Sequence, residues 1–343
     1  MDKVLSIIIP SYNARKFLDV GIPSLLAESV LDSLDIIIVN DGSADDTAEI
    51  ARTYCERYPG SIRLISQVNR GHGGALNTGF SASVGKYLRV MDADDWFLTE
   101  NLAPFVEFLR TCESDAVLNH YRTVDISNGE ILERRLPETS LGRTLTLKDM
   151  MDNRQGFERL FALHAITYRT DFYREKGIQL TEKVFYEDVE YATIPMCLAE
   201  TVSCVDLFLY EYRIGDVQQS VSDSSQLKRI GHVQKVLDRM LREYTRLADQ
   251  LDEGQKWLYC VKTRSLLLRC CTTMMLLEPD RARGREMAAE QTALVKSRMP
   301  RVYEMMRREY RLLRLVSILN ISKTKWDAFM QSPLYHRLRK LHR

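Results

Sequence analysis

Apolar runs alternate with helical patterns over the first third of the chain. β-Branched and other apolar residues fill three short stretches, at 4–10, 35–40 and 87–91, and each stretch ends in proline or polar residues. Such runs predict buried strands. Apolar positions at helical spacing between the strands predict helices at 14–31, 43–58 and 74–83, with a further strand at 62–66. Apolar strands that alternate with helices indicate a mostly parallel sheet covered on both faces.

Polar or glycine-rich segments directly follow these predicted strands. They lie at 10–13, 40–43, 69–74 and 92–95. Right-handed crossovers place the carboxyl ends of parallel strands at one edge of the sheet, where open α/β sheets bind their ligands. We therefore expect the four segments to meet at one site.

The pattern changes in the second half of the chain. After a region of short pieces with an Asn128–Gly129 hairpin turn, a helix is expected at 185–199 and a strand at 202–212. From residue 225 onward every pattern is helical, at 227–251, 255–277, 283–297 and 302–319. The expected fold is an α/β domain over 1–224, followed by an all-helical C-terminal region over 225–343.

Composition narrows the class of protein but not its partners. The 343 residues are 45% hydrophobic and 28% charged, with a net charge of +1, as in an ordinary soluble protein. Seven cysteines without a C-x-x-C pair predict free thiols in a reducing cytosol. Neither a signal peptide nor a membrane-spanning run is visible, so we expect a cytoplasmic protein.

Three carboxylates follow the predicted strand at 87–91. In an extended segment Asp92 and Asp94 would project to the same side, because they are two residues apart. Two neighbouring carboxylates repel each other unless a cation lies between them, and oxygen ligands suit Mg²⁺ or Mn²⁺. The alternative is a solvated acidic turn in which Asp95 caps the next helix.

A glycine-rich segment at 70–75 begins a predicted helix. Glycines allow close approach of a phosphate, the helix N-terminus favours anions, and Arg70 adds positive charge. The segment is not a dinucleotide fingerprint, because Leu76 stands where the third glycine belongs. His72 is interpreted as an ordinary loop histidine without a functional role.

Taken together, these motifs resemble those of family-2 glycosyltransferases, which have the GT-A nucleotide-sugar-binding fold. The resemblance covers residues 1 to about 222. It rests on I-I-I-P-S-Y-N-A at 7–14, V-N-D-G-S-A-D-D-T at 39–47, N-R-G-H-G-G-A-L-N-T-G at 69–79, V-M-D-A-D-D-W at 90–96, Y-E-D at 186–188 and Y-R-I-G…Q-S-V-S at 212–222.

The resemblance implies a nucleotide-sugar donor, with UDP as the expected nucleotide. It assigns eight residues to nucleotide binding: Pro10, Tyr12, Asn13, Asp41, Asn69, Arg70, Asp92 and Ala93. Asp94 and Asp92 would hold Mn²⁺ or Mg²⁺, which would stabilise the departing diphosphate. Taken alone, Tyr12 could equally be a half-buried aromatic residue, and Asp41 a turn residue.

The same resemblance assigns catalysis to the Tyr-Glu-Asp motif. Asp188 would be the general base of a direct, inverting displacement, with Glu187 in a supporting role. The alternative is that both acids only favour a helix N-terminus. The chain lacks the Gln-x-x-Arg-Trp motif of processive synthases, so we expect transfer of single sugars. A histidine common after Tyr-Arg-Ile in the family is replaced by Gly215.

The C-terminal 43 residues form a basic tail. Residues 301–343 contain eleven Lys and Arg residues and three acidic residues, a net charge of +8. Leucines among the arginines at 307–319 suggest an amphipathic helix on an anionic membrane, at the inner face of the cell membrane. The acceptor would then be lipid-linked rather than a free saccharide, as in surface-polysaccharide or glycolipid assembly. The alternative is a packing subdomain or a contact in a homo-oligomer.

Two other function classes stay open at this point. A sugar-nucleotide nucleotidyltransferase would need a Gly-rich basic loop after the first strand, where Ser11, Tyr12 and Asn13 stand instead. A non-catalytic nucleotide-sugar-binding protein would not need Asp188. Nucleic acid is not expected as a partner, because the basic tail lacks interleaved aromatic residues.

Overall fold

The structure is a computed structural model that describes residues 2–215, 223–332 and 335. The chain forms two compact units. The sheet unit comprises Met1–Gln219 and Ala248–Tyr259, and the helical unit comprises Ser220–Leu247 and Cys260–Arg343. A functional boundary at 224/225 stays a prediction.

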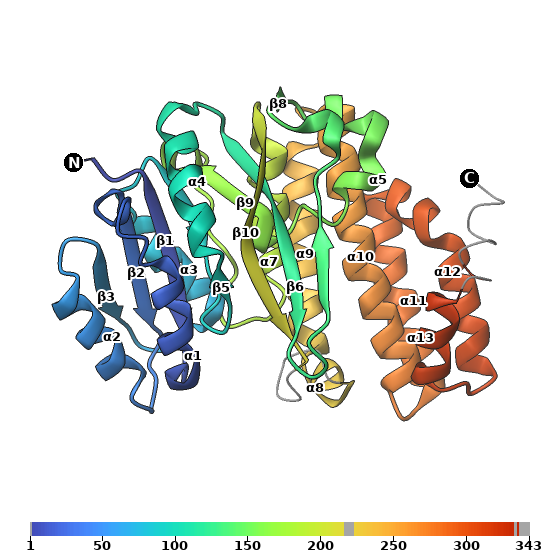
Figure 1. Ribbon diagram of the computed structural model, residues 1–343. Helices are drawn as coiled ribbons and strands as arrows, with labels where there is room; N and C mark the ends of the chain where they lie inside the picture. Colours follow the sequence, from blue (N-terminus) through green and yellow to red (C-terminus); the bar gives the residue numbers. More distant parts are fainter. Residues whose placement is uncertain (1, 216–222, 333–334, 336–343) are drawn as a thin grey trace. The chain divides into compact units, whose positions relative to one another are not determined.

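A single ten-stranded sheet forms the centre of the sheet unit (Figure 1). Its strand order is β3-β2-β1-β4-β9-β6-β10-β5, with β7 paired to β6 and β8 paired to β10. The strands are β1 (Leu5–Ser11), β2 (Leu34–Asn40), β3 (Ile62–Ser66), β4 (Tyr87–Val90), β5 (Trp96–Phe97), β6 (Ala116–Asp125), β7 (Ile131–Arg134), β8 (Thr144–Leu145), β9 (Ile166–Arg169) and β10 (Val202–Ile214).

Strands β1 to β4 are mutually parallel, so their carboxyl ends share one edge, as the sequence predicts. Beyond β4 the sheet is mixed rather than mostly parallel. Strand β9 runs antiparallel between β4 and β6, and β6 pairs in parallel with β10. The turn at Asn128–Gly129 joins β6 and β7 as an antiparallel hairpin, as expected. The α/β class followed by helices is thus confirmed, with a mixed sheet.

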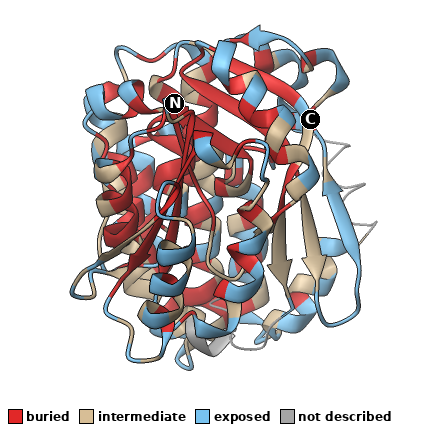
Figure 2. Ribbon diagram, turned by 60° about the vertical axis from the view of Figure 1, so that its left-hand side comes forward, coloured by how far each residue is buried: buried red, intermediate tan, exposed pale blue. Residues whose placement is uncertain are grey.

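Helices flank this sheet. They are α1 (Arg15–Gly21), α2 (Thr47–Arg57), α3 (Gly71–Ala82), α4 (Thr99–Thr111), α5 (Arg154–Phe157), α6 (Thr170–Glu175) and α7 (Asp188–Thr193). The helix expected at 14–31 is shorter, because the chain turns into a 3₁₀ segment at Pro23. Strands β1 and β2 are buried along their whole length (Figure 2).

Helix α3 lies very close to strand β1. A Cβ atom on Gly79 would stand 2.3 Å from Cγ2 of Ile8, so only glycine permits this approach. Because α3 is fixed on β1, its N-terminus at Gly71 reaches the edge where the parallel strands end.

The helical unit consists of helices, as the second half of the sequence predicts. Its helices are α8 (Asp223–Lys228), α9 (Ile230–Leu247), most of α10 (Glu253–Leu277), α11 (Arg281–Arg298), α12 (Pro300–Ile318) and α13 (Lys323–Gln331). Helix α13 was not predicted. Leu267, Met274 and Leu313 are among its fully buried side chains. Among the described residues, no helix is both long and apolar enough to cross a membrane. All seven cysteines are free thiols, and all but Cys55 are buried.

Candidate functional site

The three aspartates after β4 form a turn rather than an extended segment. The Asp95 N–H donates to the Asp92 carbonyl at 3.1 Å. Asp95 is 1% exposed and accepts hydrogen bonds from the Tyr210 hydroxyl at 2.6 Å and the Arg213 N–H at 2.8 Å. Burial, followed by the charges of Asp92 and Asp94, raises the pKa of Asp95 well above its usual range. Asp95 therefore anchors β10 to the turn and is not a helix cap.

One group of residues in the described structure has the donor set of a metal site. Ligand atoms of Asp92, Asp95 and His164 all lie within 4.8 Å of one another, whereas Asp94 is not part of this group. Burial lowers the pKa of His164 to about 4, so its ring is neutral at neutral pH. Its Nδ1 is buried without a hydrogen-bond partner. Carboxylate oxygen with neutral imidazole nitrogen suits a divalent transition metal. Sequence reasoning missed His164, which no motif marks.

His72 joins two acids that are far apart in the sequence. Its Nε2 lies 3.0 Å from Asp92 Oδ1, and its Nδ1 lies 2.6 Å from Glu187 Oε1. Burial alone would lower the pKa of His72, but the hydrogen bonds to Asp92 and Glu187 raise it well above its usual range. The Gly-rich loop is thus bonded both to the aspartate turn and to the start of α7. The interpretation of His72 as a loop histidine without a role does not account for this bridge. The position of His72 between two glycines, at the edge where the strands end, is the sequence signal that could have indicated a role.

Glu187 is placed as a buried support rather than an accessible base. It is 3% exposed, and its Oε2 is buried without a hydrogen-bond partner. Its neighbour Asp188 is exposed at the first residue of α7. The preceding loop is strained, because Lys183 and Tyr186 have φ values of 54° and 76°. Strain of this kind persists only where surrounding contacts impose it.

Glu190 supplies one of those contacts. Its carboxylate accepts from the Thr181 N–H at 2.8 Å and from the Thr181 hydroxyl at 2.7 Å. Because Glu190 is fully buried, this pair holds the loop before α7 against the helix itself. This pair thus helps to fix the start of α7, where Asp188 lies.

Tyr212, on β10, shows that the acids share one neighbourhood. Burial is the largest cause that raises the pKa of the Tyr212 phenol. Four carboxylate charges raise it further: Asp95, Asp92, Asp188 and Asp94. The candidate base and the aspartate turn thus act on the same side chain, although about 90 residues separate them in sequence.

The glycines of the 70–75 segment allow close contact with the loop before α7. A Cβ on Gly73 would stand 2.4 Å from the Thr181 carbonyl oxygen, and one on Gly71 would stand 2.9 Å from Lys183 Cα. The Lys183 N–H donates to the Arg70 carbonyl at 2.9 Å. The Arg70 guanidinium forms an ion pair with Glu182. The sequence explained these glycines by phosphate approach, whereas here they allow two backbones to touch.

The remaining predicted nucleotide-binding residues lie at the ends of β1, β2 and β3. Pro10 is buried within β1, and Tyr12 is 56% exposed just after it. The Asn13 Oδ1 accepts from the Ala44 N–H at 2.9 Å, which ties the first two strand-end loops together.

Asp41 and Asn69 shape the third strand-end loop, and Ala93 lies in the aspartate turn. Oδ1 of Asp41 accepts from Gln67 Nε2 at 2.7 Å and from the Arg70 N–H at 2.8 Å. Oδ1 of Asn69 accepts from the Gly71 N–H at 3.2 Å. The structure therefore brings all the predicted residues to one sheet edge, while their binding roles stay predictions.

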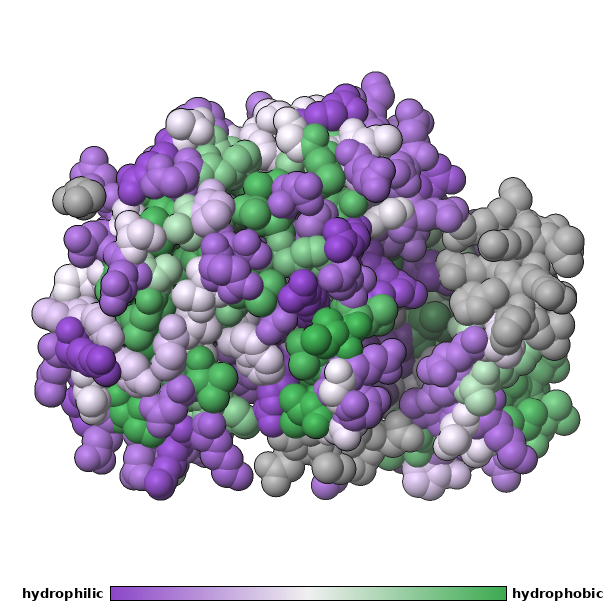
Figure 3. Space-filling view, viewed as in Figure 1, coloured by the Kyte–Doolittle hydropathy of each residue, from purple (hydrophilic) through white to green (hydrophobic). Residues whose placement is uncertain are grey.

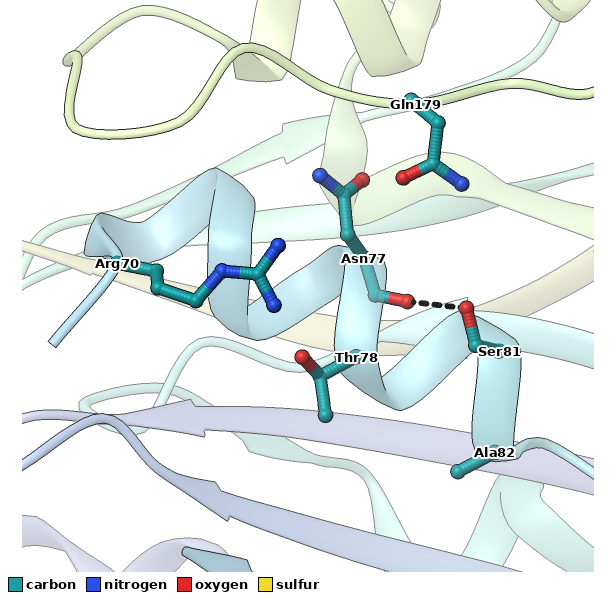
Figure 4. Close-up of a pocket in the computed structure, with 6 residues that line it drawn as sticks. All are labelled: Arg70, Asn77, Thr78, Ser81, Ala82 and Gln179. Carbon is teal, nitrogen blue, oxygen red and sulfur yellow. Dashed lines mark hydrogen bonds between the residues drawn. The ribbon is translucent and has the colours of Figure 1, made fainter. Parts of the chain in front are cut away.

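A hollow of about 420 Å³ lies along α3 and shares only Arg70 with this set (Figure 4). Its lining residues are Arg70, Asn77, Thr78, Ser81, Ala82 and Gln179. It contains none of the carboxylates, so it is not the site that the aspartate turn and α7 form.

Comparisons with known proteins agree with this geometry. A model described as Glycosyl transferase family 2 matches residues 6–174. The glycosyltransferase EpsJ of Bacillus subtilis is 32% identical over 224 residues, which cover 62% of this chain and 62% of EpsJ. The chain thus matches less than two thirds of that relative's length.

Two solved structures share the fold. The structure of residues 1–349 of S. aureus TarS, in complex with UDP-GlcNAc, aligns over 92% of this chain and 89% of that 1–349 chain, with a TM-score of 0.67 and 19% identity. The mannosyltransferase PcManGT of Pyrobaculum calidifontis, in complex with GDP-Man and Mn²⁺, covers 97% of this chain and 89% of its own, with a TM-score of 0.54 and 15% identity. At these identities the likeness shows the GT-A fold alone.

Proposed function

We propose that this chain, which belongs to glycosyl transferase family 2, transfers one sugar from a nucleoside-diphosphate sugar to a hydroxyl group of an acceptor, with inversion of configuration. The observation that carries the proposal is the bridge from Asp92 through His72 to Glu187. It joins the expected diphosphate-binding turn to the residue next to the expected base. A donor and an attacking hydroxyl need these two functions on opposite sides of one sugar ring.

In this proposal the nucleotide lies along the ends of β1 and β2. The exposed Tyr12 ring offers a face to the base, and the loops that carry Asn13, Asp41 and Asn69 line the base and ribose. Arg70, Asp92 and Ala93 lie near the diphosphate. UDP is the proposed nucleotide, supported by the UDP-GlcNAc in TarS, although PcManGT holds GDP-Man.

A divalent cation, Mn²⁺ or Mg²⁺, is proposed at Asp92. The second ligand is either Asp94, as the sequence motif implies, or His164, which the described geometry favours. When bound, the cation supplies positive charge to the leaving diphosphate. The neutral, unpartnered His164 nitrogen fits Mn²⁺ better than Mg²⁺, because Mg²⁺ prefers oxygen ligands.

Asp188 is the proposed general base. It takes the proton from the acceptor hydroxyl while that oxygen forms its bond to the anomeric carbon, and the bond from this carbon to the diphosphate oxygen breaks. Its exposure at the start of α7 leaves it accessible to an acceptor, whereas Glu187 is buried and holds His72. The acceptor is a saccharide or a lipid-linked sugar, in surface-polysaccharide or glycolipid assembly.

The test combines donor binding with turnover. A panel of nucleoside-diphosphate sugars is screened by thermal shift with and without Mn²⁺, and the best donor is then used in transfer assays. Asp188→Asn is expected to keep the metal-dependent shift and to lose transfer by about 10²–10⁴-fold. Asp171→Asn, an exposed acid on α6, is the matched control and should transfer normally.

Two of the following outcomes would contradict the proposal, and one decides between its two candidate metal ligands. Normal transfer by Asp188→Asn would remove Asp188 as the base. A metal-dependent shift lost in Asp94→Ala but kept in His164→Phe would assign the second ligand to Asp94. Absence of any donor-induced shift in the wild-type protein would overturn nucleotide-sugar binding itself.

A further inference from the structure

Helix α12 exposes an unusual number of large apolar side chains. Among the described residues, thirteen large hydrophobic side chains are exposed, and five of them lie within fifteen positions at α12 and its end. They are Met305 at 36%, Leu312 at 38%, Leu315 at 55%, Ile318 at 55% and Leu319 at 69% exposure. In Figure 3, apolar side chains gather at the lower right, where Figure 1 draws orange and red helices. Clustered exposure of this kind indicates an interaction surface.

The exposed residues form one side of the helix. Positions 305, 312, 315 and 319 are separated by 7, 3 and 4 residues, so they line one face, and Ile318 lies beside it. The neighbouring face supplies Val302, Met306 and Leu313, each fully buried in the helical unit. The helix thus has two apolar faces, and only one of them is covered by described residues.

Arginines lie on the uncovered face and beside it. Arg301, Arg307, Arg308, Arg311 and Arg314 are all exposed on α12. The only acids of α12 are Glu304, which lies 3.6 Å from Arg307, and Glu309, which is buried. The surface therefore combines leucines with a strong excess of positive charge. We call it the α12 face, defined by Met305, Arg308, Arg311, Leu312, Leu315 and Leu319.

The combination of leucines and arginines distinguishes between three possible binding partners of the α12 face. A second copy in a two-fold contact would bring the same arginines close to each other, without acids to pair them. Nucleic acid would satisfy the arginines but not the leucines, since no aromatic side chain on this face offers stacking. The surface of an anionic bilayer satisfies both, because phosphate groups meet the arginines while leucines enter the boundary of the acyl chains.

We propose that the α12 face binds the surface of an anionic phospholipid membrane, with the helix lying in the plane of the interface. The helix does not span the bilayer. The proposal does not depend on the glycosyltransferase function, since it can be measured without any sugar donor.

The experiment is co-sedimentation of the full chain with vesicles. One set is pure phosphatidylcholine, and the other contains equal parts of phosphatidylcholine and phosphatidylglycerol. Binding is expected only to the second set and should weaken as salt is added, because salt screens the charges. Each arginine removed should weaken binding about fivefold. Two double variants separate the forces: Arg308→Gln with Arg311→Gln, and Leu312→Gln with Leu315→Gln.

The matched control is Leu132→Gln, an exposed leucine on β7 in the sheet unit, which should sediment like the wild-type chain. A thermal melt of each variant checks that it is folded, and the salt series on the wild-type chain tests the proposal without any substitution. Equal sedimentation with both vesicle sets, or none with either, would overturn it. So would a wild-type dimer in solution that the leucine variant converts to a monomer, since the occupant would then be a second copy.

Discussion

The strand-end edge of the sheet unit and the interior of the helical unit are built on opposite principles. At the edge, Asp95 and Glu187 are carboxyl groups almost without exposure, and each is held by a specific partner. The helical unit buries mainly leucine, methionine and cysteine, and the one acid buried among its described residues, Glu309, is paired with Arg264 at 2.7 Å.

The buried residues of the two regions contribute in different ways: those of the helical unit to stability, and those of the sheet edge to the chemistry of the site. Burying a carboxylate is costly unless hydrogen bonds and counter-charges replace water. A chain keeps such groups where their position matters more than the free energy of unfolding. In the helical unit, the α12 face is where large apolar side chains stay exposed. We therefore expect substitutions inside the helical unit to change mainly stability, and substitutions at the sheet edge to change turnover as well.

The largest effect on stability is expected inside the helical unit. Leu313→Ala removes a fully buried side chain from α12 and should lower the free energy of unfolding by about 2–5 kcal/mol. Leu312→Ala, one position away and 38% exposed, should change it by less than about 0.5 kcal/mol. Urea denaturation of both variants measures the difference. Equal losses would show that the α12 face is not an exposed surface.

At the sheet edge the expected effect is on turnover. His72→Ala breaks the bridge between Asp92 and Glu187, and should lower kcat by about 10–100-fold, as loss of an outer-shell partner commonly does. Kinetics of sugar transfer, with kcat and KM measured separately, provide the test. Val68→Ala, an exposed residue just before this loop, is the control. An unchanged kcat in His72→Ala would reduce the bridge to a packing contact.

A third substitution tests the contact between α3 and the loop before α7. Gly73→Ala places a Cβ 2.4 Å from the Thr181 carbonyl and should cost about 1–3 kcal/mol of stability. Gly60→Ala, where a Cβ would meet no atom within 4 Å, should be close to neutral. Thermal melts compare the two. If both variants melt alike, the loop can move away from α3, and its strained conformation is not imposed by this contact.

The smallest effect concerns pH. Burial lowers the pKa of His120, which is 2% exposed and whose Nδ1 accepts from the Leu136 N–H at 2.8 Å. Because the folded pKa lies below the unfolded value near 6.5, the unfolded chain binds the proton more readily. Stability contributed by neutral His120 is therefore complete above that value and is lost as the pH falls below it.

His120→Asn should weaken this dependence. The variant is expected to be less stable at pH near 7.5, yet to lose less stability on acidification to about pH 5.5, since it has no group that titrates there. Melting temperatures of both proteins across this range give the comparison. Parallel pH profiles would show that His120 is protonated equally in the folded and unfolded chains.

Much of the strand-end edge of the sheet could be predicted from the sequence, because it depends on the local pattern of apolar and polar residues. Apolar runs ending at Pro10, Asn40 and Met91 indicated the strands, and parallel pairing then places their ends together. Helices α9 to α12 also followed from the sequence pattern, whereas α13 did not, and the helix expected at 185–199 is the shorter α7, Asp188–Thr193. The sequence could not show that β9 enters antiparallel between β4 and β6, because the direction of a short apolar strand is set by its neighbours in the sheet.

By itself the sequence determined the α/β class, the strand ends and the set of acids, since these follow from the periodicity of side chains and from motifs within ten residues. Only the tertiary structure decided which groups meet. It brought His72 to Glu187 across 115 positions, put His164 beside Asp92, and made Asp95 an anchor rather than a cap. Contacts over such distances depend on how elements pack, and glycines such as Gly73 decide how closely they can approach.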